Sequence, residues 1–208
     1  NSVQEVMDLA VVCQLATLKT SIPFLCFFDG FRTSHELQKI EVIDYETMAE
    51  LDNGELIEAF RQRALSPDRP RIKVGQQAPD VYFQGRETSN LHYAKAPQII
   101  QETMNEVSAR IGRSYKLFDY VGHPEAEEII VAMGSGCETI EETIGWLNEN
   151  RGMKLGLVKV RVYRPFASEA FLAAIPESVK RIAVLDRTKE PGSIGEPLYL
   201  DVVSAQIG

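Results

Sequence analysis

Four polar side chains that could do chemistry stand together near the start of this sequence, directly after the apolar run Ile22 to Phe28 and an Asp29-Gly30 break. An arginine binds anions, a histidine exchanges a proton near neutral pH, and hydroxyl groups donate and accept hydrogen bonds. Open α/β sheets place ligands at the carboxyl ends of their strands. The candidates for a ligand pocket or an interface are therefore Arg32, Thr33, Ser34 and His35.

A structural role explains the same residues. Thr33 and Glu36 have the spacing of a capping box at the start of a short helix, and Arg32 has an acidic neighbour with which to pair. A hydrolase built on Ser34 and His35 is disfavoured, because adjacent residues of a helix face different directions. The ligand-binding and the structural interpretations both stay open.

The turn Gly134 to Thr139 is a second candidate, because it follows an apolar run and precedes a helical pattern. Helix N-termini present free N–H groups to phosphates. However, a dinucleotide fingerprint requires glycine where Thr139 stands. We favour a tight turn over a phosphate site, since three nearby carboxylates would repel phosphate: Glu138, Glu141 and Glu142.

The cysteines and histidines do not have the spacing of a metal or cluster site. The three cysteines are far apart and form no CxxC pair, which is typical of a protein from a reducing compartment. We therefore expect a cytoplasmic protein with no metal site in this segment. The residues concerned are Cys13, Cys26, Cys137, His92 and His123.

The elements that must position these residues alternate between strand and helix in the second half of the chain. This order predicts an α/β fold with mostly parallel sheets and helices on both faces. The run Ile22 to Phe28 is expected to be a further buried strand. The other expected strands are Glu128 to Met133, Leu155 to Tyr163 and Arg181 to Leu185, with helices at Thr139 to Asn150 and Ser168 to Ala174.

The first half is mainly helical by its apolar periodicity. We expect an irregular connection over residues 66 to 80, a brief extended piece at 81 to 84, and a domain boundary between 112 and 126. The expected helices are 4 to 18, 45 to 52, 55 to 65 and 96 to 111, with a break at Asn53-Gly54 between the second and the third.

Composition restricts the partners. The net charge of −8 argues against a nucleic-acid surface, and the apolar runs are too short to cross a membrane. The basic stretch from Arg61 to Lys73 is interrupted by Asp68 and prolines, so we expect a solvated linker there. Helical or apolar patterns stand at both ends of the sequence, and we expect an internal segment of a longer polypeptide.

A series of motifs, taken in order along the chain, resembles the pyruvate:ferredoxin (flavodoxin) oxidoreductase family. A departure is Ala78, where the family more often has asparagine. By this resemblance, residues 1–115 are the C-terminal part of the pyrimidine-binding domain with its linker, and residues 116–208 are similar to the transketolase C-terminal domain. The motifs are Asn1 to Ala10, Phe27 to Glu36, Val81 to Glu87, Lys116 to Tyr120, Met133 to Ile140, Tyr163 to Phe166 and Leu185 to Val202.

The resemblance implies a parent enzyme that oxidatively decarboxylates pyruvate to acetyl-CoA. It implies thiamine diphosphate, magnesium and iron–sulfur clusters as cofactors, coenzyme A as co-substrate, and ferredoxin or flavodoxin as electron acceptor. The remaining domains of the parent chain and a second copy of it would be the other partners. By the resemblance, this segment would be scaffold and interface, inactive by itself, with no catalytic residue and no cofactor-binding residue of its own. The alternatives are a related 2-oxo acid:ferredoxin oxidoreductase and a stand-alone α/β phosphate-binding module.

Overall fold

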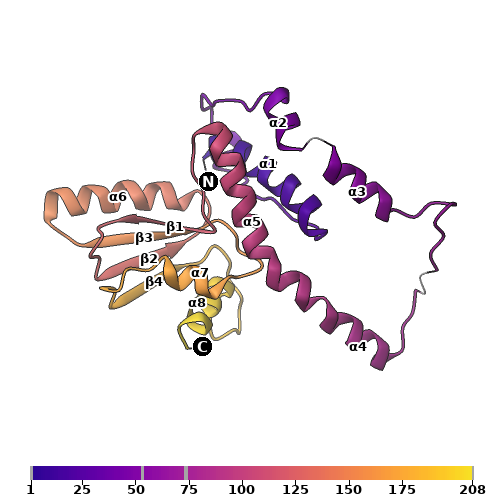
Figure 1. Ribbon diagram of the computed structural model, residues 1–208. Coiled ribbons are helices and arrows are strands. Elements are labelled where there is room, and N and C mark those ends of the chain that lie inside the picture. Colours follow the sequence, from indigo (N-terminus) through magenta and orange to yellow (C-terminus); the bar gives the residue numbers. More distant parts are fainter. Residues whose placement is uncertain (1, 53, 73–74, 208) are drawn as a thin grey trace. The chain divides into compact units, whose positions relative to one another are not determined.

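The computed structural model describes residues 2–52, 54–72 and 75–207 (Figure 1). The chain forms two compact units that interleave along the sequence. The first unit contains the residues up to Met7, Phe27–Glu41 and the chain from Tyr115 onward. The second unit contains Asp8–Cys26 and Val42–Ser114.

The first unit is built on a four-stranded sheet in the order β1-β3-β2-β4. Strands β2, β3 and β4 are parallel, and β1 pairs antiparallel with β3 at one edge. The mostly parallel α/β sheet predicted for the second half is confirmed, whereas the edge strand β1 was not predicted. The strands are β1 (Phe118–Gly122), β2 (Glu128–Ala132), β3 (Leu155–Val160) and β4 (Arg181–Leu185).

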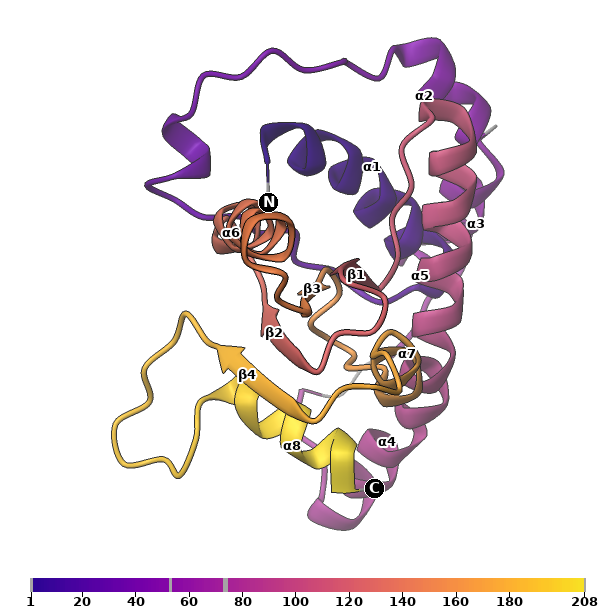
Figure 2. The ribbon, with the colours of Figure 1, turned by 90° about the vertical axis from the view of Figure 1, so that its left-hand side faces the viewer.

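Helices cover both faces of this sheet, as predicted. Helix α6 (Gly136–Arg151) lies on one face, and α7 (Ser168–Ala173) and α8 (Pro197–Ile207) lie on the other (Figures 1 and 2). The chain moves from β2 to β3 in one direction and then crosses back over β2 to β4. Right-handed crossovers in opposite directions put their helices on opposite faces.

Apolar side chains from the central strands and the helices form the core of the first unit. On the α6 face, Ala132 and Leu157 pack with Cys137 and Ile144. Elsewhere in the unit, three aromatic rings have centroids 5.3 to 5.4 Å apart. The rings are Phe118, Phe166 and Phe171.

The second unit is helical in its described residues. Helix α1 begins in the first unit, continues into the second and buries Val12, Leu15 and Ala16. The fully buried carboxylate of Asp8 on α1 receives two hydrogen bonds from the guanidinium of Arg113, at 2.6 and 2.9 Å. The helices are α1 (Val3–Thr20), α2 (Tyr45–Leu51), α3 (Glu55–Arg63), α4 (Pro79–Thr88) and α5 (Asn90–Ile111).

Two predictions for the first half are wrong. The run Ile22 to Phe28 has no regular secondary structure, and Leu25 is 83% exposed. A strand is stable only when its backbone groups pair with a neighbour, and no described strand lies alongside this run. Residues 81 to 84 are helical rather than extended, because Pro79 begins α4 at a position that suits proline.

The remaining helices of the first half are confirmed, with shifted ends. Helix α5 begins before the predicted residue 96, so Pro97 lies inside it rather than in its first turn. The break between α2 and α3 is confirmed at Gly54, which has a φ of 93°. Asn53 of that break, Lys73 of the basic stretch and Asn1 of the first motif lie outside the described residues.

Among the helices of the described residues, none is both long enough and apolar enough to cross a bilayer.

Candidate functional site

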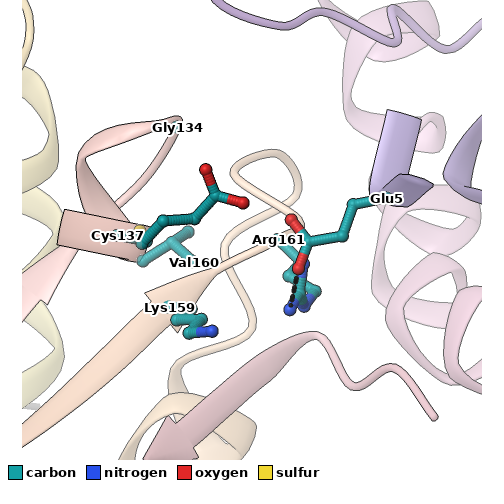
Figure 3. A pocket seen from close by; sticks show the side chains of 7 residues that line it. Glu5, Gly134, Cys137, Lys159, Val160 and Arg161 are labelled. Carbon is teal, nitrogen blue, oxygen red and sulfur yellow. Dashed lines mark hydrogen bonds and ion pairs between the residues drawn. The ribbon is translucent and has the colours of Figure 1, made fainter. Parts of the chain in front are cut away.

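The sheet of the first unit has a crevice at the carboxyl ends of β2 and β3. The chain leaves β2 toward the α6 face and leaves β3 toward the opposite face, so the two loops diverge there. Such a topological switch point is where open α/β folds bind ligands. The residues that line the hollow are Glu5, Gly134, Cys137, Glu138, Lys159, Val160 and Arg161 (Figure 3).

The hollow is small and mixed in charge. Its empty space is about 240 Å³ with open solvent included, whereas ligand pockets have about 300–1,000 Å³. Two carboxylates, Glu5 and Glu138, face two cations, Lys159 and Arg161. This size and charge balance do not suit a nucleotide or a diphosphate, and they argue against the phosphate-binding module.

Arg161 is the centre of the charge network. Its side chain is 8% exposed, and its guanidinium nitrogens lie 2.8 Å from Glu5 Oε1 and 2.5 Å from Asp119 Oδ2. Figure 3 shows the Glu5 carboxylate meeting Arg161 at the side of the hollow. The guanidinium carbon also lies 5.1 Å from the ring centroid of Tyr115, a cation–π distance.

The network changes the pKa values of its members. Burial by itself would raise the pKa of Glu5, but the hydrogen bond and the positive charge of Arg161 outweigh it and lower that pKa from 4.5 to about 2. Burial would lower the pKa of Arg161, and its bonds to Glu5 and Asp119 instead raise it above the usual value. Glu5 and Arg161 are therefore both charged throughout the physiological range.

A second carboxylate reaches the same edge of the sheet. Asp29 Oδ2 accepts a hydrogen bond from the backbone N–H of Ser135, and Asp29 Oδ1 lies 2.5 Å from Arg187 Nη1. Burial would raise the pKa of Asp29, but these hydrogen bonds and the charge of Arg187 lower it. The side chain of Asp29 is 12% exposed, so it is a nearly buried anion with two partners.

Two other lining residues are also held in place. Lys159 pairs with Glu141 on α6. Cys137 lies in the first turn of α6, where a helix dipole favours a thiolate, but burial raises the pKa of its thiol. The thiol is therefore protonated near neutral pH.

The predicted polar cluster does not line this crevice. Thr33–His35 form a single turn of 3₁₀ helix just after Asp29, without a side-chain cap, so the capping-box spacing is not realised there. Ser34 Oγ lies 2.8 Å from His35 Nδ1, and Arg32 lies 4.0 Å from Glu36. Arg32, Ser34 and His35 are exposed, whereas Thr33 is 5% exposed. The assignment of the cluster to a pocket or interface stays a prediction.

The cysteines and histidines form no metal site in the part of the chain that the structure describes. Cys13 is half-buried and Cys26 is exposed, and the two thiols are within hydrogen-bond reach of each other. His123 accepts a hydrogen bond from the backbone N–H of Glu125 at 3.0 Å, which is a local turn contact.

The sequence did not identify Glu5, Asp29, Asp119, Arg161 and Arg187 as a set. Glu5 and Arg161 are separated by 156 residues, and Asp29 and Ser135 by 106. One local signal was available, because Arg161 is a charged residue directly after a buried strand, where side chains reach the ligand-binding edge of a sheet.

Two family models match the chain in order. The model described as "Pyruvate flavodoxin/ferredoxin oxidoreductase, thiamine diP-bdg" matches residues 1–105. The chain belongs to the pyruvate flavodoxin/ferredoxin oxidoreductase family. The model described as "Pyruvate:ferredoxin oxidoreductase core domain II" matches residues 126–207, which contain β2, β3 and β4. The predicted boundary between 112 and 126 stays a prediction.

Similar oxidoreductases match nearly the whole chain. It is 61% identical over 201 residues to pyruvate:ferredoxin oxidoreductase of Moorella thermoacetica and 56% identical over 205 residues to pyruvate-flavodoxin oxidoreductase of Enterobacter agglomerans. These matches cover 97% and 99% of the chain and 17% of each relative. The chain is also 53% identical to pyruvate dehydrogenase [NADP(+)] of Cryptosporidium parvum, over 97% of its length and 10% of that relative.

The described residues do not fit a thiamine diphosphate site. A diphosphate needs cations or free N–H groups, and the crevice cations Lys159 and Arg161 already pair with carboxylates of the chain. The described residues also contain no group of three carboxylate, histidine or cysteine side chains that could hold its metal ion. The first family model names thiamine diphosphate binding, so this family's cofactor contacts are not explained by the crevice.

Proposed function

We propose that the chain is a framework and interface segment of a pyruvate:ferredoxin (flavodoxin) oxidoreductase. The whole protein would oxidatively decarboxylate pyruvate to acetyl-CoA, and the segment would join the end of its thiamine-diphosphate-binding region to its second domain. The observation that carries this proposal is the 61% identity to the Moorella enzyme over 97% of the chain.

The cofactors and partners belong to the whole protein in this proposal. Thiamine diphosphate, magnesium, iron–sulfur clusters and coenzyme A would contact other parts of the polypeptide, and the protein would work in the cytoplasm as a homo-oligomer. The exposed run with Leu25, Phe27 and Phe28 supports this division, because neighbouring large apolar side chains on a surface are typical of a site that another protein surface covers.

The proposal is tested with the full-length polypeptide and with the 208-residue chain in parallel. The full-length protein is expected to reduce ferredoxin or flavodoxin in the presence of pyruvate and coenzyme A. The chain alone, after circular dichroism has shown that it is folded, is expected to give no heat of binding with thiamine diphosphate. Saturable binding at micromolar concentration by the chain alone would contradict the framework role.

The electron acceptor has a second candidate. The Cryptosporidium relative is named for NADP(+) rather than for ferredoxin or flavodoxin, although it is 53% identical to this chain. Assays with ferredoxin, flavodoxin and NADP(+) separate the three acceptors. Parallel assays with other 2-oxo acids test whether pyruvate or a related acid is the substrate.

A further inference from the structure

The carboxylate of Asp29 lies at the start of α6, where many α/β folds bind the anion of a ligand. Backbone N–H groups at the start of a helix bind anions. Here the N–H of Ser135, directly before α6, donates to Asp29, and Arg187 from the loop after β4 pairs with the other oxygen of the same carboxylate. Arg187 also lies 3.3 Å from Ser135 Oγ. The two partners of the aspartate, Ser135 and Arg187, are thus also linked to each other.

The backbone next to Ser135 is fitted to this aspartate. Gly134 has a φ of 83°, a conformation that favours glycine. A Cβ atom at Gly134 would lie 2.9 Å from Asp29 Oδ2 and 3.2 Å from Oδ1. Glycine therefore permits both the turn and the close approach of the carboxylate.

Several contacts attach the N-terminal segments of the first unit to the edge of its sheet. Glu5 pairs with Arg161 at the crevice. Gln4 exchanges two hydrogen bonds with the backbone of Glu41, at 2.7 and 2.9 Å, which ties α1 to the end of the Phe27–Glu41 segment. The carboxylates of Glu5 and Asp29 come from residues that the first family model matches. Their partners Arg161 and Arg187 come from residues that the domain II model matches.

We propose that the switch-point crevice of domain II is a docking site for the thiamine-diphosphate-binding region, and that the carboxylates of Asp29 and Glu5 are its ligands. The edge of the sheet that binds small molecules in related architectures serves here as an electrostatic latch between two parts of one polypeptide. The inference deepens the proposed function and rests on it for the identity of the two domains.

The latch positions the polar cluster predicted from the sequence. The backbone N–H of Ser34 donates to the carbonyl oxygens of Asp29 and Gly30, each at 3.2 Å. The turn that carries Arg32 and His35 is therefore built directly on the latched residue. Asp29 and Arg187 are positioning residues in this scheme, because they act through the segment that follows Asp29.

The test is hydrogen exchange in the full-length protein, followed in peptides that cover residues 27–36 and 133–137. Asp29→Asn and Arg187→Gln are each expected to speed exchange about tenfold, which is about 1.4 kcal/mol. The double variant is expected to stay near tenfold, because both substitutions remove the same pair. Sodium chloride at about 1 M is expected to speed exchange in the unsubstituted protein and not in the double variant.

The matched control is Lys189→Gln. Lys189 lies in the same loop as Arg187 but pairs with Glu196 of that loop, so less than a twofold change is expected. An effect of Lys189→Gln equal to that of Arg187→Gln, or a hundredfold effect in the double variant, would overturn the latch. Hydrogen exchange is measured without catalysis of any reaction. A negative result for the latch is therefore independent of a negative result in the pyruvate assay, and the two proposals can fail separately.

Discussion

Replacing Arg161 with methionine tests the charge network most directly. Methionine replaces the aliphatic part of the arginine side chain but not its guanidinium. The substitution therefore removes the cation between Glu5 and Asp119, whose side chains are only 18% and 20% exposed. Removing one partner of a buried ion pair costs about 3–5 kcal/mol. Because both carboxylates keep some contact with water, we expect the lower end, about 3 kcal/mol.

The assay is urea unfolding followed by the fluorescence of Trp146. This is the single tryptophan of the chain, and it is 52% exposed on α6 with the guanidinium of Arg151 5.7 Å from its ring centroid, so its signal reports the unfolding of this helix of the first unit. With a slope of about 1.5 kcal/mol per molar urea, a loss of about 3 kcal/mol lowers the midpoint by about 2 M. Arg164→Met is the control, because Arg164 is 54% exposed in its pair with Asp201 and should cost less than about 1 kcal/mol.

The pH dependence supplies an independent check. The pKa of Glu5 is lowered from 4.5 to about 2, so its contribution is complete above pH 4.5 and is lost as the pH falls toward 2. That shift corresponds to about 3 kcal/mol, and residual solvent screening reduces it to about 2 kcal/mol. The stability gap between the protein and Arg161→Met should therefore narrow between pH 5 and pH 2.5. A constant gap, or a cost no larger than that of Arg164→Met, would refute the reasoning.

Two further predictions concern the sheet and use the same fluorescence assay. Gly156→Ala should lower the free energy of unfolding by about 2 kcal/mol, because the new Cβ would lie 2.6 Å from the ring of Tyr120 on the neighbouring strand. The control is Gly145→Ala on α6, where the new Cβ meets no atom within 4 Å. This substitution should stabilise the protein by about 0.5–1 kcal/mol, because alanine is the better helix former. Equal effects of these two alanines would contradict the steric argument. Asn148→Ala should cost about 2 kcal/mol, because its side chain makes two hydrogen bonds, at 2.9 and 3.0 Å, with the backbone at the start of β3. Asn150→Ala removes one exposed bond within α6 and should have a smaller effect, so equal costs for the two asparagines would count against this explanation.

The sequence predicted the elements of the second half because their signals are local. The alternation of apolar strands such as Glu128–Ala132 with amphipathic helices is visible within about ten residues. The edge strand Phe118–Gly122 lacks such a run, since it carries Asp119, Tyr120 and Gly122. Its pairing depends on β3, which lies more than thirty residues further along the chain.

The candidate site depended on long-range information. Local spacing drew attention to Arg32 and His35, whereas the structure brings Asp29 and Glu5 to the edge of the sheet. Each of these carboxylates has a partner more than one hundred residues away, and no periodicity encodes such a pairing. The run Ile22 to Phe28 has the apolar pattern of a buried strand, but Leu25 is 83% exposed and no described strand pairs with the run. An apolar pattern does not encode whether a pairing strand is present.

The distance along the chain between Asp29 and Ser135 has a consequence for biosynthesis. A ribosome adds about 5–20 residues per second, so the 106 residues between them take about 5–20 s to appear. During that interval the nascent polypeptide carries Phe27, Phe28 and Phe31 without the contact between Asp29 and Ser135, and these side chains remain 44–91% exposed even in the folded chain. Translation speed and chaperone capture across this window would therefore govern the yield of correctly assembled protein.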